Sequence, residues 1–356
     1  MATQKKTTKK KGILERLKEG VVLGDGGYIL ELERRGYVQA GPYTPEVAIE
    51  HPEALRELHR EFLRAGADVL QALTFYASKE KLGTAGYAGK VKAINRAAVR
   101  IAKEVAGSKA LVAGTLCLTW MYDPKDPASR KRVRRLFDEQ IAAQASEGVD
   151  FFIGETFAFL EEARICLRAI KDAGYPAMLT FTLRQPTSGD GTPVGECAKI
   201  MMGEGADVVG VNCGRDPAHM LPLVAEMRRA VSGYVAAQPI GYRTRDDIPH
   251  FTQLPEFPLG LDPLTLTRAD MAGFAVKARD LGVNYIGSCC GAVAHHVRAM
   301  AEALGRTPPA SAKSPDLSRH PGIQKTRTLE ELAGRKPKSP DAPQFGTGKG
   351  GGRGGW

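Results

Sequence analysis

The feature that most constrains this chain is a regular alternation of strand-like and helix-like segments. Apolar runs end in glycine or polar residues, and each is followed by a stretch with helical apolar spacing. Roughly eight such units, each of about 30–40 residues, follow one another between residues 21 and 304. Alternation of this kind builds a parallel sheet covered by helices. Eight units predict an α/β fold of the (β/α)8 TIM barrel type, with an open doubly wound sheet as the alternative.

The two periodicities also place the individual elements. Strands are predicted at 21–23, 67–75, 110–116, 150–157, 177–183, 208–213, 234–242 and 283–291. Helices are predicted at 12–17, 52–65, 90–106, 130–147, 159–173, 194–203, 217–231, 267–281 and 293–304. Reactive groups of such barrels lie at the C-terminal ends of the strands, so residues at those ends are the candidates for chemistry.

Net positive charge is confined to the two ends of the chain. Residues 1–12 hold five lysines and no acid, residues 313–356 hold nine Lys/Arg against four Asp/Glu, and the segment between them is formally neutral. A nucleic-acid-binding domain needs its basic patch on a folded face, so no nucleic-acid partner is expected. The chain is therefore divided into a basic flexible tail (1–12), a barrel (13–311), and a C-terminal arm with a Gly-rich flexible tail (312–356).

Cysteine usage and hydropathy indicate a compartment. No N-terminal apolar segment resembles a signal peptide, and no run approaches the roughly 18 apolar residues that span a membrane. The six cysteines lack the spacing of a small disulfide scaffold. We therefore predict a cytoplasmic protein with reduced thiols and no membrane partner, in which clustered cysteines are more often metal ligands or catalytic groups.

Three cysteines stand at the ends of two predicted strands. Cys289 and Cys290 are adjacent and lie between Gly287 and Gly291, while Cys213 ends an earlier apolar run. Adjacent cysteines rarely bond to each other, because disulfide geometry does not suit neighbouring residues. Cys213 alone has the alternative of being a small buried apolar residue. Together the three predict Zn²⁺ held by three thiolates with an open fourth position, the arrangement of catalytic zinc sites.

Such a site favours a particular chemistry. Zinc with three thiolate ligands suits a soft fourth ligand, above all a substrate thiol, and coordination removes the proton of that thiol. A free thiol is mostly protonated at pH 7. The result is a positioned sulfur nucleophile, as methyl transfer to a thiol requires. The alternative from a different class is a non-catalytic zinc-binding scaffold, which a fourth protein ligand would favour.

Acidic and aromatic residues are predicted at the same end of the barrel. Asp25 follows the first strand and Glu155 ends the fourth, so two acids could receive a substrate ammonium group, although a cap or surface ion pair is the alternative for each alone. Tyr43, Phe75 and Tyr76 could form an aromatic pocket for a cationic methyl donor, worth about 0.5–2 kcal/mol per ring, with ordinary packing as the alternative.

Two further features near these residues are interpreted separately. Gly26 and Gly27 beside Asp25 would let backbone N–H groups approach a substrate carboxylate. His295 and His296 are explained by the start of a helix and are not assigned as metal ligands.

Several stretches resemble the zinc-dependent homocysteine S-methyltransferases and, within that family, the betaine–homocysteine S-methyltransferases. GVNC (210–213) with GSCCG (287–291) marks the wide family, and RGYVQAGP (35–42) with TFYAS (74–78) marks the betaine branch. The likeness extends from about Gly12 to about Ser311 and includes GILERL (12–17), GDGG (24–27), LHREFLRAGADV (58–69), GECA (195–198) and LPEFPLGLDP (254–263).

The resemblance implies a mechanism and its participants. The overall reaction would convert betaine and homocysteine into dimethylglycine and methionine, with the sulfur of homocysteine on zinc. It implies a homo-oligomer, a dimer or tetramer, assembled through a C-terminal arm. The implied residues are Cys213, Cys289 and Cys290 for zinc, Asp25, Gly26, Gly27 and Glu155 for homocysteine, and Tyr43, Phe75 and Tyr76 for the methyl donor.

The chain also departs from the family pattern at the donor end. Tyr43 stands where the family has Trp, and Thr156 stands where the betaine enzymes carry an aromatic residue. Trp120 or Tyr122 could replace the missing ring, and the segment beyond residue 312 is shorter than the family's arm. A sulfonium donor, S-methylmethionine or dimethylsulfoniopropionate, is therefore the alternative to betaine. The homocysteine module of a cobalamin-dependent methionine synthase is less well supported, because the chain has no Asp-x-His-x-x-Gly motif.

Overall fold

The computed structural model describes residues 10–316. The chain divides into two compact units, Met1–Ser314 and Pro315–Trp356, and the fold described below belongs to the first. Most of the predicted N-terminal tail and C-terminal arm lies outside the described residues, so both remain predictions. At the boundary, a short 3₁₀ helix (η4, Pro309–Lys313) continues the barrel unit slightly past the predicted limit.

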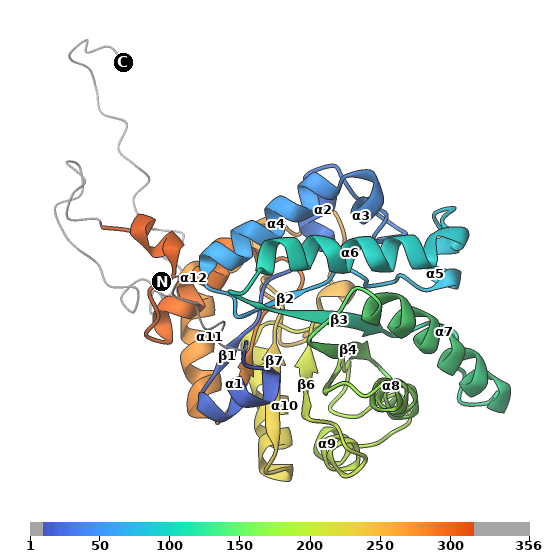
Figure 1. The fold of residues 1–356 in the computed structure, drawn as a ribbon. Helices are drawn as coiled ribbons and strands as arrows, with labels where there is room; N and C mark the ends of the chain where they lie inside the picture. Colours follow the sequence, from blue (N-terminus) through green and yellow to red (C-terminus); the bar gives the residue numbers. More distant parts are fainter. Residues whose placement is uncertain (1–9, 317–356) are drawn as a thin grey trace, which may run out of the picture. The chain divides into compact units, whose positions relative to one another are not determined.

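Eight parallel strands form a single sheet that curls into a barrel surrounded by helices (Figure 1). The strand order is β1-β8-β7-β6-β5-β4-β3-β2, so each strand from β2 to β8 pairs with its neighbour in the sequence and β1 pairs with β8. The predicted (β/α)8 TIM barrel is confirmed. The strands are β1 (Val22–Leu23), β2 (Val69–Gln71), β3 (Leu111–Cys117), β4 (Phe151–Phe157), β5 (Ala177–Phe181), β6 (Val208–Asn212), β7 (Tyr234–Gln238) and β8 (Tyr285–Ile286).

A carboxylate completes the barrel between its first and second strands. The backbone N–H of Asp68 donates to the carbonyl of Leu23 at 2.8 Å, and the side chain of Asp68 accepts from the N–H of Leu23 at 2.8 Å. Arg306, which follows the last barrel helix, donates to the same carboxylate at 2.6 Å. The beginning and the end of the barrel are thereby joined at one residue.

The helices lie close to their predicted positions. The long ones are α4 (Pro52–Ala65), α6 (Val91–Ala106), α7 (Pro127–Ala145), α8 (Leu160–Asp172), α9 (Val194–Gly203), α10 (Pro217–Ala230), α11 (Arg268–Asp280) and α12 (Ala294–Ala303). The short ones are α1 (Ile13–Glu19), α2 (Ile29–Arg34), α3 (Val47–Glu50) and α5 (Lys79–Gly83), with 3₁₀ turns η1 (Ala88–Lys90), η2 (Phe251–Gln253) and η3 (Asp262–Leu264). None of the described helices is long and apolar enough to cross a bilayer.

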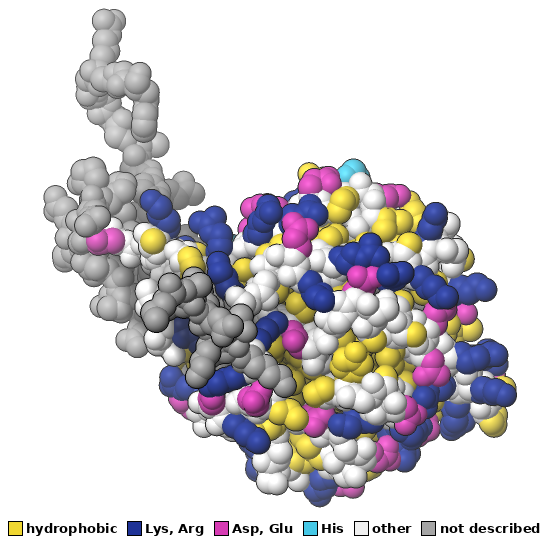
Figure 2. All heavy atoms as spheres, viewed as in Figure 1, with side chains coloured by type: hydrophobic (Ala, Val, Ile, Leu, Met, Phe, Trp, Pro, Cys, Tyr) yellow, Lys and Arg dark blue, Asp and Glu magenta, His cyan; other side chains and the backbone are white. Residues whose placement is uncertain are grey.

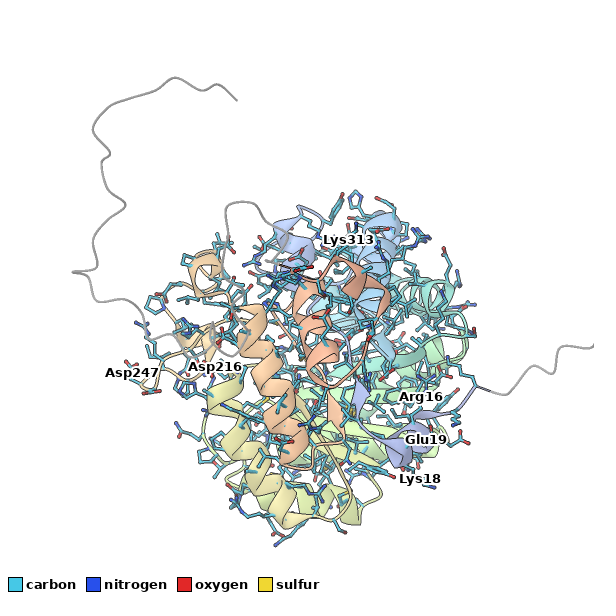
Figure 3. The ribbon with its side chains drawn as sticks, turned by 90° about the vertical axis from the view of Figure 1, so that its left-hand side faces the viewer. Arg16, Lys18, Glu19, Asp216, Asp247 and Lys313 are labelled. Atoms are coloured by element: carbon cyan, nitrogen blue, oxygen red, sulfur yellow. The ribbon has the colours of Figure 1, made fainter. Side chains whose placement is uncertain are left out.

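Helix α1 closes the N-terminal end of the barrel. Its Ile13 and Leu17 are buried against interior residues of the strands, among them Leu111 and Phe151. Figure 3 shows α1, with Arg16, Lys18 and Glu19 labelled, on the opposite side of the barrel from Asp216 and Asp247, which follow β6 and β7. The C-terminal ends of the strands therefore remain for a functional site.

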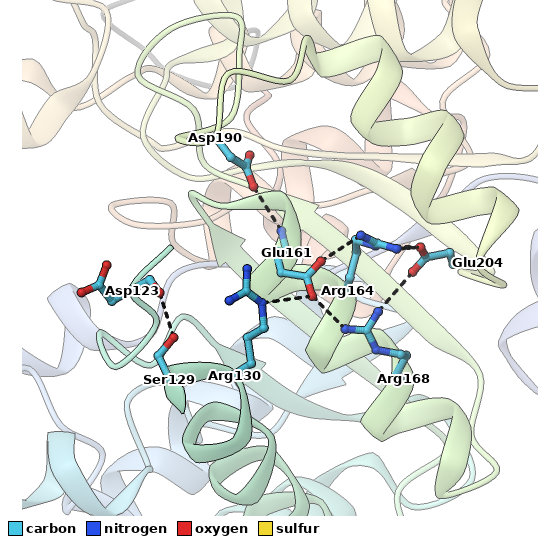
Figure 4. Close-up of polar contacts among 8 residues, drawn as sticks. All are labelled: Asp123, Ser129, Arg130, Glu161, Arg164, Arg168, Asp190 and Glu204. Atoms are coloured by element: carbon cyan, nitrogen blue, oxygen red, sulfur yellow. Dashed lines mark hydrogen bonds and ion pairs between the residues drawn. The ribbon is translucent and has the colours of Figure 1, made fainter. Parts of the chain in front are cut away.

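Hydrogen bonds at the start of α8 anchor a loop at that end of the barrel, and ion pairs lie on the outside of the same helix (Figure 4). Asp190, from the loop after β5, accepts hydrogen bonds from the N–H groups of Leu160 and Glu161 at the start of α8, at 3.3 Å each. The carboxylate of Glu161 pairs with Arg164 at 2.8 Å and Arg130 at 3.8 Å. Exposed pairs of this kind contribute about 0–1 kcal/mol, so the loop itself is held by the backbone hydrogen bonds to Asp190.

Basic and acidic side chains are interspersed over the face shown in Figure 2. This distribution fits the formal neutrality of residues 13–312.

Candidate active site

Three cysteine sulfurs meet at the C-terminal end of the barrel. Cys213 directly follows β6, and Cys289 and Cys290 follow β8. The Sγ atoms of Cys213 and Cys290 lie 3.6 Å apart, and all three sulfurs lie within 4.8 Å of one another. Tetrahedral zinc with Zn–S bonds of about 2.3 Å places its sulfur ligands about 3.8 Å apart. The donor set and its spacing therefore fit a zinc ion.

The backbone around the cysteines has little freedom. Cys213 has φ 54° and is followed by Gly214 at φ 69°, so the chain turns sharply as it leaves β6. The amide N–H of Cys289 donates to the carbonyl of Pro239 at 2.8 Å. A Cβ at Gly27 would lie 2.6 Å from the carbonyl oxygen of Cys289, so only glycine fits there. These contacts hold the sulfurs in place independently of a metal.

The sulfur cluster opens onto a cavity of about 210 Å³ whose wall includes all three cysteines. Among residues 10–316, no fourth His, Cys, Asp or Glu ligand atom belongs to the cluster. A metal held by the three thiolates would therefore have its remaining position on the cavity side.

Hydrogen bonds among the thiols separate their pKa values. Bonds from Cys289 and Cys290 lower the pKa of Cys213 well below its ordinary value. The bond to Cys213 raises the pKa values of Cys289 and Cys290. Cys213 is thus the first to form a thiolate. Because binding a cation requires the other two protons to leave, metal binding becomes stronger as the pH rises.

Asp25 lies just after β1 and is buried. Its Oδ2 accepts hydrogen bonds from the backbone N–H of Gln71 at 2.7 Å and from the hydroxyl of Tyr28. Burial raises the pKa of this carboxyl to about 7. Asp25 itself does not line the cavity, whereas Tyr28 and Gln71 do. The acid is therefore placed one layer behind the wall.

The two glycines after Asp25 differ in whether their backbone N–H groups are free to donate a hydrogen bond. The N–H of Gly27 donates to the carbonyl of Ala292 at 2.8 Å, so it is already occupied. The N–H of Gly26 has no hydrogen-bond partner in the described part of the chain. Neither glycine is part of the cavity wall.

Glu155, in β4, lines the cavity and is held on both oxygens. Its Oε1 accepts from the side-chain amide of Gln71 at 2.5 Å, and its Oε2 accepts from the amide of Asn212 at 3.0 Å. Burial raises its pKa well above the ordinary value. Gln71 contacts both acids, since its backbone binds Asp25 and its side chain binds Glu155.

The residue after Glu155 has an unusual backbone that Asn212 maintains. Thr156 has φ 64°, a costly conformation for a β-branched residue, and the β4–β5 register shifts at this point. Asn212 accepts from the N–H of Thr156 at 2.9 Å and donates to its hydroxyl at 2.8 Å. The same amide therefore fixes both the strained turn and the carboxylate beside it.

The described non-glycine residues with positive φ all lie in the cavity wall or shortly after the C-terminal end of a strand. They are Tyr43, Tyr76, Trp120, Thr156 and Cys213. Such conformations cost about 1–3 kcal/mol each and concentrate at functional sites. Their distribution independently points to this end of the barrel.

Tyr43, Phe75 and Tyr76 all line the cavity, and the rings of Phe75 and Tyr76 lie 4.2 Å apart. Phe251 and Phe257, from the long loop after β7, add two further rings to the wall, which the sequence analysis did not predict.

Trp120 and Tyr122 are outside the cavity wall. Trp120 is 64% exposed and lies 6.5 Å from Tyr76, with the ammonium of Lys81 over both rings at 4.7 and 4.1 Å. The ring of Tyr122 packs 5.4 Å from Phe159. Neither replaces the aromatic residue that is absent at Thr156.

The remaining residues of the wall that sequence reasoning missed are largely polar. A Gln or Asn close to the end of an otherwise apolar strand was the available signal for two of them. The polar ones are Tyr28, Gln71, Thr115, Thr182, His250 and Thr252 in the wall, with Asn212 directly behind it. The apolar ones are Ile29, Leu30, Ala72 and Leu73.

A family model described as homocysteine S-methyltransferase matches residues 22–304. The chain belongs to the homocysteine S-methyltransferase family. This confirms the resemblance found in the sequence and makes the protein a methyltransferase that acts on the thiol of homocysteine.

Individual relatives support the assignment. Betaine–homocysteine S-methyltransferase 1 of Mus musculus is 46% identical over 320 residues, covering 85% of this chain and 78% of the relative. S-methylmethionine–homocysteine S-methyltransferase BHMT2 of Mus musculus is 42% identical over 325 residues, covering 88% of each. The metallated form of the homocysteine methyltransferase MmuM from Escherichia coli has a similar fold, with TM-score 0.64 and 20% identity over 80% of this chain and 96% of that one.

Proposed function

We propose that this protein transfers a methyl group from betaine to homocysteine, giving dimethylglycine and methionine, with Zn²⁺ held by Cys213, Cys289 and Cys290. The observation that carries the proposal is the three-sulfur cluster in the wall of a cavity lined by an acid and several aromatic rings. When bound there, zinc supplies a position for a soft sulfur ligand and keeps that sulfur a thiolate at neutral pH.

Glu155 and Asp25 receive the amino end of homocysteine in this proposal. Both carboxyls have raised pKa values because they are buried, and a substrate ammonium group would lower those values and favour the ionised form. Glu155 is directly accessible from the cavity, and Asp25 acts from behind Tyr28 and Gln71. The carboxylate end is assigned to the turn at Gly26 and Gly27, where the N–H of Gly26 has no partner among the described residues, although neither glycine is part of the cavity wall.

Tyr43, Phe75 and Tyr76 form the pocket for the methyl donor, with Phe251 and Phe257 adding to it. A quaternary ammonium gains about 0.5–2 kcal/mol over each suitable aromatic face. Orientation of the donor methyl toward the sulfur then supplies much of the rate enhancement. The relatives at more than 40% identity include a betaine enzyme, in agreement with this donor.

A sulfonium donor is the second candidate, favoured by two observations. Thr156 leaves the donor end with one ring fewer than the betaine enzymes, and a relative at 42% identity is named for S-methylmethionine. The scaffold alternative is weaker, because no fourth protein ligand joins the sulfurs among the described residues. We also infer a cytoplasmic protein that assembles as a homo-oligomer, a dimer or a tetramer.

The deciding experiment measures methionine formation by zinc-loaded protein from homocysteine and one of three donors. Betaine, S-methylmethionine and dimethylsulfoniopropionate are compared at equal concentrations. We expect the highest kcat/KM with betaine and loss of activity after chelation, restored by added Zn²⁺. Methyl transfer that continues at full rate without zinc would refute the mechanism. A clearly higher kcat/KM with a sulfonium would show that the sulfonium, and not betaine, is the methyl donor.

A further inference from the structure

A buried chain of hydrogen bonds leads from the cavity wall into the protein through Tyr28. The hydroxyl of Tyr28 donates to Oδ2 of Asp25 and lies 2.9 Å from Nδ1 of His59. The Tyr28 ring lines the cavity and is held by ring contacts with His59 at 5.0 Å and Phe62 at 5.2 Å. Neither Tyr28 nor His59 was expected from the sequence to belong to the site.

When Asp25 is ionised, the number of available protons fixes the direction of this chain of hydrogen bonds. A tyrosine hydroxyl has one proton, and the carboxylate of Asp25 is the stronger of its two possible acceptors. Nδ1 of His59 must then carry the proton of the neutral imidazole and donate it to the oxygen of Tyr28. Burial lowers the pKa of His59 to about 3, which keeps the ring neutral. The chain therefore runs from His59 through Tyr28 to Asp25.

His59 itself points to a role beyond packing. It is fully buried, and its Nε2 has no hydrogen-bond partner. Leaving such an atom unpaired is costly, so an apolar residue would serve better if the position only filled space. Among residues 10–316, the one polar contact of the His59 side chain is with the hydroxyl of Tyr28.

We propose that Tyr28 is a positioning residue for homocysteine, whose hydroxyl is oriented by His59 and holds the carboxylate of Asp25 toward the amino end of the substrate. The inference rests on the proposed function, since it assigns Asp25 to the substrate ammonium group. Without this hydroxyl, Asp25 keeps only the backbone N–H of Gln71 as a partner on that oxygen. The carboxylate would then be poorly stabilised and free to rotate away from the substrate.

The test compares two thiol acceptors in Tyr28→Phe. Homocysteine carries the amino group, and 4-mercaptobutyrate is the same thiol acid without it. We expect KM for homocysteine to rise at least about tenfold, the size of a lost hydrogen bond to a charged group. KM for 4-mercaptobutyrate, KM for betaine and zinc content should stay within about twofold of the wild type. His59→Phe should also raise KM for homocysteine, by a smaller factor.

Tyr87→Phe is the matched control. It also removes a tyrosine hydroxyl that donates to a carboxylate, that of Glu50, but Tyr87 is not part of the cavity wall. Its kinetics should equal those of the wild type. The proposal would be overturned if KM for homocysteine is unchanged in Tyr28→Phe. It would also be overturned if KM rises equally for homocysteine and 4-mercaptobutyrate.

The outcome is separable from that of the proposed function. Homocysteine and 4-mercaptobutyrate binding to zinc-loaded protein, measured by calorimetry, gives the same comparison without any donor. If wild-type protein makes no methionine, the proposed function fails while the binding comparison still decides the role of Tyr28. If Tyr28→Phe does not fold, His59→Phe is judged by the same criterion.

Discussion

The sulfur of Cys213 lies 3.6 Å from that of Cys290, although 77 positions separate them in the chain. The two residues follow strands on either side of β7, and the chain around β7 bonds to both. The N–H of Cys213 donates to the carbonyl of Gln238, and the N–H of Gly241 donates to the carbonyl of Cys290, each at 2.8 Å. The cluster is therefore fixed by the sheet as well as by any ion it binds.

Replacing Cys213 with alanine should remove zinc and activity together. The variant leaves two adjacent thiols, which cannot provide the three-ligand set. We expect zinc per chain, measured by atomic absorption, to fall from about one to near zero, and methionine formation to fall at least about a hundredfold. Cys197→Ala in α9 removes a buried cysteine outside the cluster and should retain its zinc. A Cys213→Ala protein with stoichiometric zinc would contradict the ligand assignment.

Gly27→Ala should weaken zinc binding without touching a ligand side chain. The added Cβ would lie 2.6 Å from the carbonyl oxygen of Cys289 and 3.0 Å from Cα of Cys290, so the cysteine pair must move. We expect zinc affinity, measured by competition with a chelating dye, to fall about tenfold or more. Gly273→Ala in α11 is the control, because its Cβ meets nothing within 4 Å and should stabilise the helix by about 0.5–1 kcal/mol. Equal zinc affinity in both variants would argue against this steric coupling.

The barrel and its sulfur cluster could both be predicted from the sequence, and the same physical reason explains both. Strand–helix alternation has a strong period, and parallel strands bring their C-terminal ends to one side. Residues that end predicted strands, such as Cys213 and Glu155, could therefore be expected near one another. The short helices α2, α3 and α5 were missed because four to six residues carry too little periodicity.

The parts of the site that escaped prediction depend on pairings across the fold. Gln71 bonds two acids, one 46 and the other 84 positions away, and nothing local to Gln71 indicates either contact. Strands β2 and β8 are shorter than predicted, because the chain leaves the ladder to form the turns of the site. Phe251 comes from a loop without periodicity, whereas Trp120, which was expected to supply a ring, is exposed and outside the wall.

Tyr76→Ala should weaken the use of betaine more than that of homocysteine. Tyr76 lines the cavity beside Phe75, and its loss removes one aromatic face, worth up to about 2 kcal/mol or about thirtyfold in apparent affinity. Steady-state kinetics should show KM for betaine raised by about five- to thirtyfold, with KM for homocysteine within about twofold. Tyr122→Ala, outside the wall, is the comparison. An unchanged KM for betaine would remove Tyr76 from the donor pocket.

His296 should make the protein more sensitive to acid. Its Nδ1 accepts a hydrogen bond from the N–H of Val293 at 3.1 Å, and its Nε2 lies 2.7 Å from the carbonyl oxygen of Leu266. Both nitrogens of the neutral ring therefore have partners. Protonation of Nδ1 would break its bond with Val293. Burial lowers its pKa to about 4, whereas an unfolded histidine titrates near 6.5. The unfolded state then binds more protons between these values, so the stabilising contribution is complete above about pH 6.5 and is lost as the pH falls through about 4.

His296→Gln keeps a donor and an acceptor but removes the titration. In urea unfolding at pH values from 7 to 4, the free energy of unfolding of the wild type should therefore fall more steeply than that of the variant. The difference in slope should approach about 1.4 kcal/mol per pH unit, the value for one proton, between pH 6 and 4. His51→Gln is the control, because it makes the same substitution at a histidine whose side chain is 46% exposed. Parallel curves for wild type and His296→Gln would show that His296 binds its proton equally in both states.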